Sequence, residues 1–350
     1  MKNITLLSVI LLTACSINVN AQNGFSELIK SGPADATRLF DAYSSPLFKG
    51  FGVGMNSGWN NTAKTNGKLK FELRITASGA FVPSSNKNFD VTKIGLSNHL
   101  RVAPGNQVTS PTIAGGNNRS TLEVYNDNNQ KVDEFRLPAG KLSVMPAPQV
   151  QLTIGLIKNT DLALRGMPPI NLGNDIGKVW MFGFGLKHNI MADLQGAGIP
   201  TPFDLALAFG FSRMRMDVPL DVQPEGNAQP LPGNTNNDFS NQHAQGRFNN
   251  FQIQALISKK FSKVTPFFSL GYNTSKTAIT VTGNYPITTQ TAAGQDFYET
   301  FTNPVSINKL YLNGLRADLG FQVDLSFFRI FGSYTAAQYQ SVNAGIGFGF

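Results

Sequence analysis

Residues able to do acid–base, nucleophilic or metal chemistry are few in this sequence and form no recognised motif. Its three histidines, His99, His188 and His243, stand in no metal-ligand spacing such as His-Glu-x-x-His. His188 falls on the lipid-facing side of a predicted strand, as expected of an interfacial histidine. Asp133 and Glu134 are adjacent carboxylates beside a predicted turn, where we expect them to be solvated rather than to act as an acid–base pair. We therefore predict no catalytic residue, no cofactor and no metal site, and the chain is not expected to be an enzyme.

A more informative pattern is the alternation of charged and apolar residues along predicted strands. In residues 69–82, Leu73 and Ile75 share one face, whereas Glu72 and Arg74 share the other. Charged side chains are too costly in hydrocarbon, so their face is predicted to line a barrel lumen. There the charges would either pair around a plug or line a polar transport path. The candidate lumen-facing residues of the whole chain are Lys68, Lys70, Glu72, Arg74, Asp161, Arg165, Asp204, Arg316, Asp318, Asp324 and Arg329.

The last ten residues alternate without interruption between apolar side chains and small or polar ones. A period of two indicates a β-strand with a different environment on each face. In a soluble protein so apolar a terminal strand would be an edge prone to aggregation. The pattern favours a strand that closes a barrel and faces lipid, and it is similar to the C-terminal recognition strand of outer-membrane barrels. Phe348 and Phe350 are the candidate closing residues.

Composition supports a barrel over other classes. Charged residues make up 14% of the 350, whereas soluble domains usually contain about 25%. The 34 Gly and 27 Phe suit tight turns and a lipid-facing surface. A secreted β-sandwich would share the strands and turns, but it buries its apolar faces and needs fewer exposed aromatic residues. The net charge of +8 comes without clustered Lys and Arg, so nucleic-acid binding is not predicted.

Residues 1–21 have the features of a signal peptide. Lys2 supplies the positive start, and residues 4–12 supply an apolar core too short to span a bilayer. Cleavage after Ala21 is favoured, and a lipobox ending at Cys15, where the cysteine would be lipidated, is the alternative. No later run of 18 apolar residues follows, so membrane-spanning helices are not predicted. We expect export to the cell outer membrane of a Gram-negative bacterium.

Residues 22–49 are predicted to be helical. Pro33 stands at a plausible helix start, and Leu39, Phe40 and Tyr43 fall on one side before Ser45-Pro46. Two interpretations remain open: a periplasmic lead-in that caps the barrel mouth, and a plug inserted into the lumen, with these three as the candidate plug residues. Residues 50–56 are assigned to the first strand, and we attribute their alternate glycines to close approach of a plug or a neighbouring strand.

The barrel is predicted to span residues 50–350. Eleven strands are assigned outside residues 83–147. This segment is rich in Asn, Gly, Ser and Pro and contains a predicted hairpin at 121–136; it could be a folded loop, an inward constriction or one to three further strands. Tight connections such as 259–262 alternate with long polar ones such as 217–247, which is typical of outer-membrane barrels. Because both ends of the barrel chain are expected on the short-turn side, the strand number must be even. Residues 83–147 would therefore add one or three strands to the eleven assigned. The fold class is therefore an all-β, transmembrane antiparallel barrel of about 12 or 14 strands, with 14 favoured.

The whole pattern resembles the fatty-acid-transporter-like (FadL-like) family of outer-membrane proteins. The resemblance rests on the short helical N-terminal segment, the long outer loops and the terminal Phe. Members often carry an Asn-Pro-Ala run in the plug, where this chain has Gly32-Pro33-Ala34 and Ser45-Pro46-Leu47. The resemblance implies a barrel of about fourteen strands and uptake of long-chain fatty acids or other apolar compounds.

Three functions follow as hypotheses. The first is a porin-like channel or transporter for small solutes, hydrophobic ones included. The alternative is a non-conducting structural or assembly barrel of the outer membrane. The third is a barrel enzyme acting on lipids. The expected partners are outer-membrane lipid, the barrel-assembly machinery and a solute that the sequence does not identify.

Overall fold

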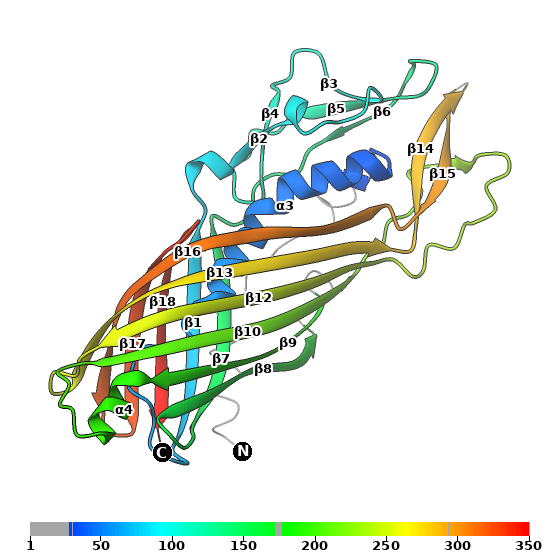
Figure 1. Cartoon of the computed structure of the whole chain (residues 1–350). Coiled ribbons are helices and arrows are strands. Elements are labelled where there is room, and N and C mark those ends of the chain that lie inside the picture. The colour runs from blue at the N-terminus through cyan, green and yellow to red at the C-terminus, as the bar shows by residue number, and fades with distance from the viewer. Residues whose placement is uncertain (1–27, 30, 172–176, 293, 350) are drawn as a thin grey trace.

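The computed structural model describes residues 28–349 apart from residues 30, 172–176 and 293. In this part of the chain, ten strands form a closed antiparallel barrel in the order β1-β18-β17-β16-β13-β12-β10-β9-β8-β7 (Figure 1). The strands are β1 (Phe71–Phe81), β7 (Val144–Gly155), β8 (Thr160–Asn171), β9 (Lys178–Asn189), β10 (Asp204–Pro219), β12 (His243–Ser258), β13 (Val264–Thr282), β16 (Val305–Leu325), β17 (Phe328–Ala336) and β18 (Gln340–Gly349).

Tight connections lie mainly at one end of the barrel and long ones mainly at the other, as predicted; the exceptions are the longer connection 190–203 at the first end and the short connection 337–339 at the second. We call the end with the tight connections 156–159, 259–263 and 326–327 the turn end, and the other the loop end. Helix α4 (Ile190–Gly196) joins β9 to β10 at the turn end. At the loop end, β14 (Asn284–Ala292) and β15 (Gln295–Thr302) form a hairpin that also pairs with β11 (Gln229–Pro230) and projects beyond the barrel (Figure 1).

The barrel is closed by β18, the strand predicted for that place. It pairs with β17 on one side and with β1 on the other, where Leu73 lies opposite Phe348. The ring of Phe348 also packs against Phe328, with the ring centroids 5.4 Å apart. Phe350 lies outside the described residues, as do Ala21 and Cys15, on which the two cleavage hypotheses depend.

Residues 84–142 form a small cap at the loop end rather than further barrel strands. The hairpin of β5 and β6 is confirmed, with Thr121 opposite Arg136. These cap strands have three to six residues, whereas about 9–11 are needed to cross a bilayer. The cap contains η1 (Ser84–Asn86), β2 (Asn88–Asp90), η2 (Val91–Lys93), β3 (Leu100–Val102), β4 (Thr109–Pro111), β5 (Thr121–Tyr125) and β6 (Lys131–Arg136).

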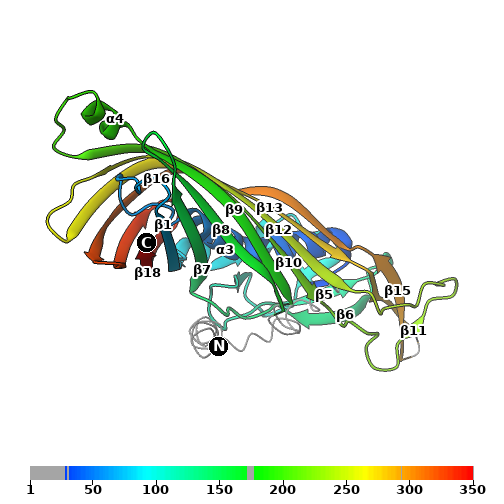
Figure 2. The same cartoon turned by 90° about the horizontal axis from the view of Figure 1, so that it is seen from below.

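Helix α3 (Pro33–Asn56) begins beneath the cap and runs into the barrel (Figures 1 and 2). It starts at Pro33 as predicted, but it continues through Pro46 and through residues 50–56, which we had assigned to a strand. With this helix and the cap, the prediction of 12 or 14 strands is wrong: ten of the eleven assigned strands lie in the barrel, and the eleventh is helical. No helix of the described chain is long and apolar enough to cross a membrane.

The outward face of the barrel carries the apolar side chains that strand parity predicts. On β13 the alternate residues Phe268, Leu270 and Tyr272 are 40%, 57% and 38% exposed, whereas Ser269 and Asn273, which point to the opposite face, are buried. So many exposed large apolar side chains on one continuous surface are unusual for a soluble monomer. On β13 this apolar belt runs from Val264, near the turn end, to Tyr272.

A charge placed in this belt should destabilise the protein in a bilayer. We expect Leu270→Arg to lower the free energy of unfolding in lipid vesicles by about 2–4 kcal/mol. The matched control is Val108→Arg in the cap, at a position 45% exposed, where the cost should be within about 0.5 kcal/mol. Folding titrations in urea measure both values, and equal losses would show that the β13 surface does not face lipid.

Candidate functional site: the occupied lumen and its mouth

Three glycines allow helix α3 to fit between opposite walls of the barrel. Gly50 and Gly54 share one face of the helix, and a Cβ atom on either would lie 2.6 Å from the Cβ atom of Met145 or Ala147 on β7. On the other face, a Cβ on Gly52 would lie 2.5 Å from the Cβ of Ser275 on β13. In the ring of strands, β7 and β13 are directly opposite each other. At this level the lumen therefore admits little more than a bare helix backbone between the two walls.

The predicted cause of these glycines, close approach to a neighbouring strand, is confirmed, although the glycines themselves lie in a helix rather than in a strand. Above them, Phe48 of the helix packs in a buried cluster with Phe248 and Tyr311 of the wall. The ring centroids of Phe48 and Tyr311 are 5.0 Å apart. The upper part of the contact between helix and barrel is thus apolar, and the part below the glycines is polar.

The carbonyl groups at the end of α3 are bound by buried cationic side chains of the wall. The last four carbonyls of a helix lack partners within it, and the last turn of α3 contains no basic residue of its own. Arg165 donates from Nη1 to the Met55 carbonyl and from Nη2 to the Ser57 carbonyl, both at 2.9 Å. Arg316 donates to the Asn56 carbonyl at 2.6 Å. These bonds place positive charge at the negative end of the helix dipole.

Two wall glutamines and a third arginine complete this set. Gln149 donates to the Gly54 carbonyl at 2.6 Å, and Gln151 donates to the Trp59 carbonyl at 3.2 Å. Arg74 also reaches the Trp59 carbonyl, at 3.4 Å. We call Arg74, Gln149, Gln151, Arg165 and Arg316 the carbonyl cage. Its members come from β1, β7, β8 and β16, so the cage is formed only when the barrel is closed.

Arg165 is unusual within the cage because it has no carboxylate partner among the described residues. Arg74 pairs with Glu72 at 3.0 Å, and Arg316 pairs with Asp318. Arg165, 1% exposed, instead has the helix carbonyls, the Gln151 side chain and the ring of Trp59, which its guanidinium covers at 3.7 Å. The helix end thus takes the place of a counter-ion for this buried charge.

Below the cage, the chain that leaves the helix is fixed by Trp59 and Lys187. The Trp59 ring is 2% exposed and occupies space left by Gly185 and Gly210, where an added Cβ would lie 3.0 and 2.7 Å from ring atoms. Lys187 Nζ donates to the Thr62 carbonyl at 3.1 Å and pairs with Asp161 at 3.1 Å. The segment between the helix and β1 is therefore held against the lumen wall.

The upper half of α3 contacts the cap rather than the lumen. Leu39 is fully buried in the cap core with Leu122 and Phe135. Phe40 packs against both this core and the cluster at the barrel mouth. The Tyr43 hydroxyl donates to the Ala139 carbonyl at 2.8 Å, and burial raises the pKa of this hydroxyl well above its ordinary value. Of the three candidate plug residues, Leu39 and Tyr43 therefore contact the cap rather than the lumen, and Phe40 lies between the cap and the barrel mouth.

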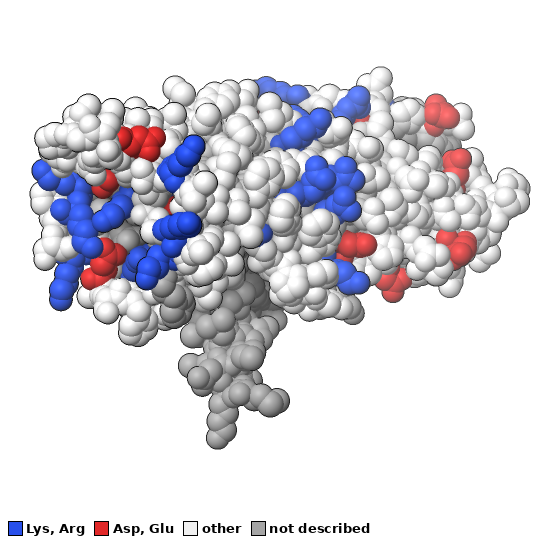
Figure 3. Space-filling view, turned by 60° about the horizontal axis from the view of Figure 1, so that its bottom comes forward, with Lys and Arg blue, Asp and Glu red and all other residues white. Residues whose placement is uncertain are grey.

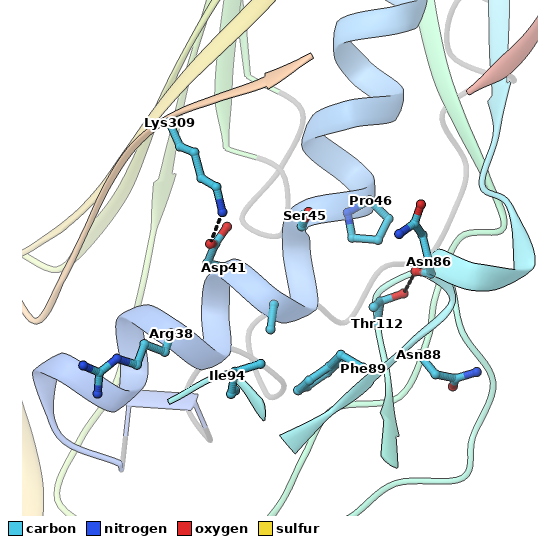
Figure 4. A pocket seen from close by; sticks show the side chains of 11 residues that line it. Arg38, Asp41, Ser45, Pro46, Asn86, Asn88, Phe89, Ile94, Thr112 and Lys309 are labelled. Carbon is cyan, nitrogen blue, oxygen red and sulfur yellow. Dashed lines mark hydrogen bonds and ion pairs between the residues drawn. The ribbon is translucent and has the colours of Figure 1, made fainter. Parts of the chain in front are cut away.

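A cavity of about 380 Å³ lies at the barrel mouth between α3, the cap and β16 (Figure 4). On one side Asp41 of the helix pairs with Lys309 at 2.8 Å and accepts a hydrogen bond from the Tyr311 hydroxyl. Phe89 and Ile94 of the cap supply an apolar side. The size is within the range of small-molecule sites, about 300–1,000 Å³. It is lined by Arg38, Asp41, Ala42, Ser45, Pro46, Asn86, Asn88, Phe89, Ile94, Thr112 and Lys309.

The predicted lumen residues fall into three groups. The first is buried inside the barrel: Glu72, Arg74, Asp161, Arg165, Arg316 and Asp318. The second lies near the turn end, where Arg329 bridges Glu72 and Asp324 at 2.8 and 3.5 Å, and Asp204 accepts from Asn189 at 2.8 Å. Lys68 and Lys70 are exposed in the turn before β1, so their assignment to the lumen is wrong. The error arose because the alternating pattern was extended to residues that precede Phe71, the first residue of the strand.

Sequence reasoning missed several residues that hold the helix. Lys187 was detectable, because it alternates with the outward residues Phe184 and Leu186 of its strand. Trp59 gave no signal, since neither its spacing nor its neighbours indicate that it contacts glycines of β9 and β10. Gln149 and Gln151 alternate with the apolar residues Val150 and Leu152, but nothing in the sequence indicates that they bind helix carbonyls.

The histidines lie away from the lumen. At the turn end, His188 Nδ1 is 3.0 Å from Thr160 Oγ1, and Nε2 is 3.0 Å from Asp193. A hydrogen bond from Asn159, together with His188, holds the pKa of the Asp193 carboxyl below its usual value. The Thr160 hydroxyl donates to the Lys158 carbonyl, so it accepts from the imidazole. In the described part of the chain, no three His, Cys, Asp or Glu side chains gather as a metal site.

Loss of Arg165 should loosen the helix end. We expect Arg165→Met to lower the free energy of unfolding in vesicles by several kcal/mol, since two buried carbonyls would each lose a partner at about 1–3 kcal/mol. Arg101→Met in the cap is the matched control, because Arg101 also covers an aromatic ring, Tyr125 at 4.2 Å, but is exposed. The control should cost at most about 1 kcal/mol. A loss for Arg165→Met no larger than the control's would contradict the role given to the cage.

Comparison with solved structures gives distant likenesses. The chain is similar to Ail, the attachment invasion locus protein of Yersinia pestis, with 11% identity and a TM-score of 0.26 over 81% of this chain and 100% of that one. It is also similar to the outer membrane protease OmpT from Escherichia coli, with 8% identity and a TM-score of 0.34 over 84% of this chain and 100% of that one. The toluene transporter TodX of Pseudomonas putida has 7% identity and a TM-score of 0.28 over 88% of this chain and 70% of that one. Likeness this low assigns no activity.

The comparison with curated proteins returns no significant match. A family model, in contrast, matches residues 1–350. The chain therefore belongs to the Family of unknown function (DUF6588).

Proposed function

We propose that this protein is an outer-membrane β-barrel of a Gram-negative bacterium whose lumen is closed by its own helix, and that it does not conduct in its resting state. Membrane insertion is supported by the closed strand ladder, which leaves no edge, and by the apolar outward belt. The short turns would face the periplasm and the long loops the outside. The closing strand β18 is the segment that the barrel-assembly machinery would meet before the barrel closes.

The observation that carries this proposal is the fit of α3 between opposite walls. Gly50 and Gly54 face β7 and Gly52 faces β13 at distances that exclude a side chain. The arginines of the cage then fix the helix end through buried, charge-assisted hydrogen bonds, each worth about 1.5–3 kcal/mol. A helix held in this way supports closure of the pore rather than a passage for solutes.

In this function the barrel serves as a membrane anchor for what it presents at the loop end. The cap rests on the upper half of α3, and residues such as Leu39 belong to its core. The β14–β15 hairpin stands beside it. We infer that the chain is not an enzyme: His188 and Asp193 are half exposed at the turn end, outside the cavity at the barrel mouth.

A second candidate, transport of small solutes, is favoured by the cavity at the mouth. Its lining includes Asp41 and Pro46 of the helix, so a bound solute would touch the closing element itself. Pro46 has no N–H to offer the Ala42 carbonyl, so the helix is weakened where it enters the barrel. Transport, including the uptake of apolar compounds expected of FadL-like proteins, would require α3 to shift.

Two deletions test closure by the helix. Removal of residues 22–56 should leave a folded barrel with a much larger conductance in planar bilayers, because the ladder of strands does not include the helix. Removal of residues 22–44 is the control, since it spares the part between the walls and should change conductance little. Low conductance of a folded barrel after the longer deletion would contradict the proposal.

Solute transport has its own test. Asp41→Asn removes the ion pair that joins α3 to Lys309, and it should speed solute entry into vesicles if movement of the helix is the gate. Swelling of vesicles with glycerol, or uptake of a radiolabelled fatty acid, measures the rate. Equal, background-level entry for the wild type and the variant would remove transport as a candidate.

A further inference from the structure

Four basic side chains form a group on the outward face of the barrel, apart from the lumen charges. Arg213 and Arg215 lie two residues apart on β10, and Arg247 and Lys276 lie on the neighbouring strands β12 and β13. Arg215 is directly opposite Arg247 in the register, and Arg213 and Lys276 are both opposite Asn249. Neighbouring strands are about 4.8 Å apart, so the four charges share one small area. We call them the basic patch.

The basic patch has no anionic partner in the described protein. None of its four members forms an ion pair with a described carboxylate; the nearby Asp217 is 2.7 Å from His243 instead. Arg213 donates to the Asn249 side chain at 2.7 Å, and the Arg215 guanidinium lies 5.2 Å from the centre of the Trp180 ring. Like charges directly opposite each other on a sheet are destabilising. An external anion would offset this repulsion.

The position of the basic patch restricts what that anion can be. Arg213 is opposite Phe182, and the next row towards the turn end consists of Phe184, Phe211 and Phe251. The charges therefore begin at the loop-end limit of the apolar belt, level with the exposed Phe182 and Leu310 and with Trp180 beside them. Aromatic residues and basic side chains at such a boundary are typical of the headgroup level of a membrane. Figure 3 shows Lys and Arg gathered near the middle of this face as well as at one end of the molecule.

We propose that the basic patch binds the phosphate groups of the anionic glycolipid in the outer leaflet. This inference rests on the proposed membrane location. Acyl chains of the lipid would cover the Phe184, Phe211 and Phe251 row while its phosphates reach the guanidinium groups above. Arginine suits this role, because its planar donors bind phosphate oxygens in pairs. The turn end differs from the basic patch, because its charges are of both signs and pair with one another: Lys260 and Arg329 both contact Asp324.

The test compares two variants that each lose four charges. In the first, Arg213, Arg215, Arg247 and Lys276 are all changed to Gln. In the control, the exposed turn-end residues Lys68, Lys70, Lys259 and Lys263 are changed to Gln. Each protein is folded in phosphatidylcholine vesicles, in the same vesicles containing lipid A, and in phosphatidylcholine vesicles with inorganic phosphate. The thermal midpoint of unfolding and the lipopolysaccharide that co-purifies from cells are measured.

We expect lipid A to raise the midpoint of the wild type and of the control variant but not that of the patch variant. Co-purified lipopolysaccharide should fall in the patch variant by about fivefold for each charge removed, as expected for basic residues at an anionic membrane surface. Inorganic phosphate should have no effect, and a shift with it alone would overturn the assignment to lipid. Equal shifts for both variants, with all proteins folded, would overturn this inference alone. Failure of the wild type to fold in any vesicle would instead overturn the membrane location.

Discussion

The closure of the lumen depends on one set of contacts, the hydrogen bonds between buried wall arginines and the carbonyl end of helix α3. Arg165 has no carboxylate partner in the described chain, so without the helix its charge would face an uncompensated lumen. The helix has the matching deficit, because its last carbonyls have no partners of their own. A buried arginine without a partner and a buried carbonyl without a partner each destabilise the protein, and the hydrogen bonds between them remove both costs. This reciprocity explains why a helix with three glycines in its last turns keeps its form inside the barrel.

The same contacts connect the membrane part to the cap. Helix α3 is one continuous element whose lower half is fixed by the cage and whose upper half contributes Leu39 to the cap core. Asp35, 3% exposed, accepts from the Ser97 backbone at 3.0 Å and ties the helix to the cap a second time. Movement of the helix end would therefore displace the cap at the loop end. In the same way, a partner or solute bound at the mouth would shift the helix and so change how tightly the lumen is closed.

Much of the barrel could be predicted from the sequence, because each strand separates two environments and its side chains record both. Ten strands and the closing role of Phe348 followed from parity alone. Residues 50–56 did not, because seven residues with alternate glycines fit a strand and a helix equally well, and only the walls at Met145 and Ser275 decide between them. The amphipathic side of Leu39 was real, but its partner, a cap built from short strands, leaves no pattern of its own. Contacts between distant segments, such as Trp59 with Gly210, are likewise absent from local sequence.

The most direct test is whether the helix can be cross-linked to the inner wall. A Cβ on Gly54 would lie 3.9 Å from the Cβ of Ser78, within the usual disulfide range of about 3.5–4.5 Å. In a chain with Cys15→Ser, and with Ala147→Gly to make room, Gly54→Cys and Ser78→Cys should form a disulfide in vesicles, detected by mobility before and after reduction. Moving the second cysteine to the outward neighbour, Ala77→Cys, should abolish it. No disulfide in the first protein, or equal cross-linking in both, would contradict a helix held inside the lumen.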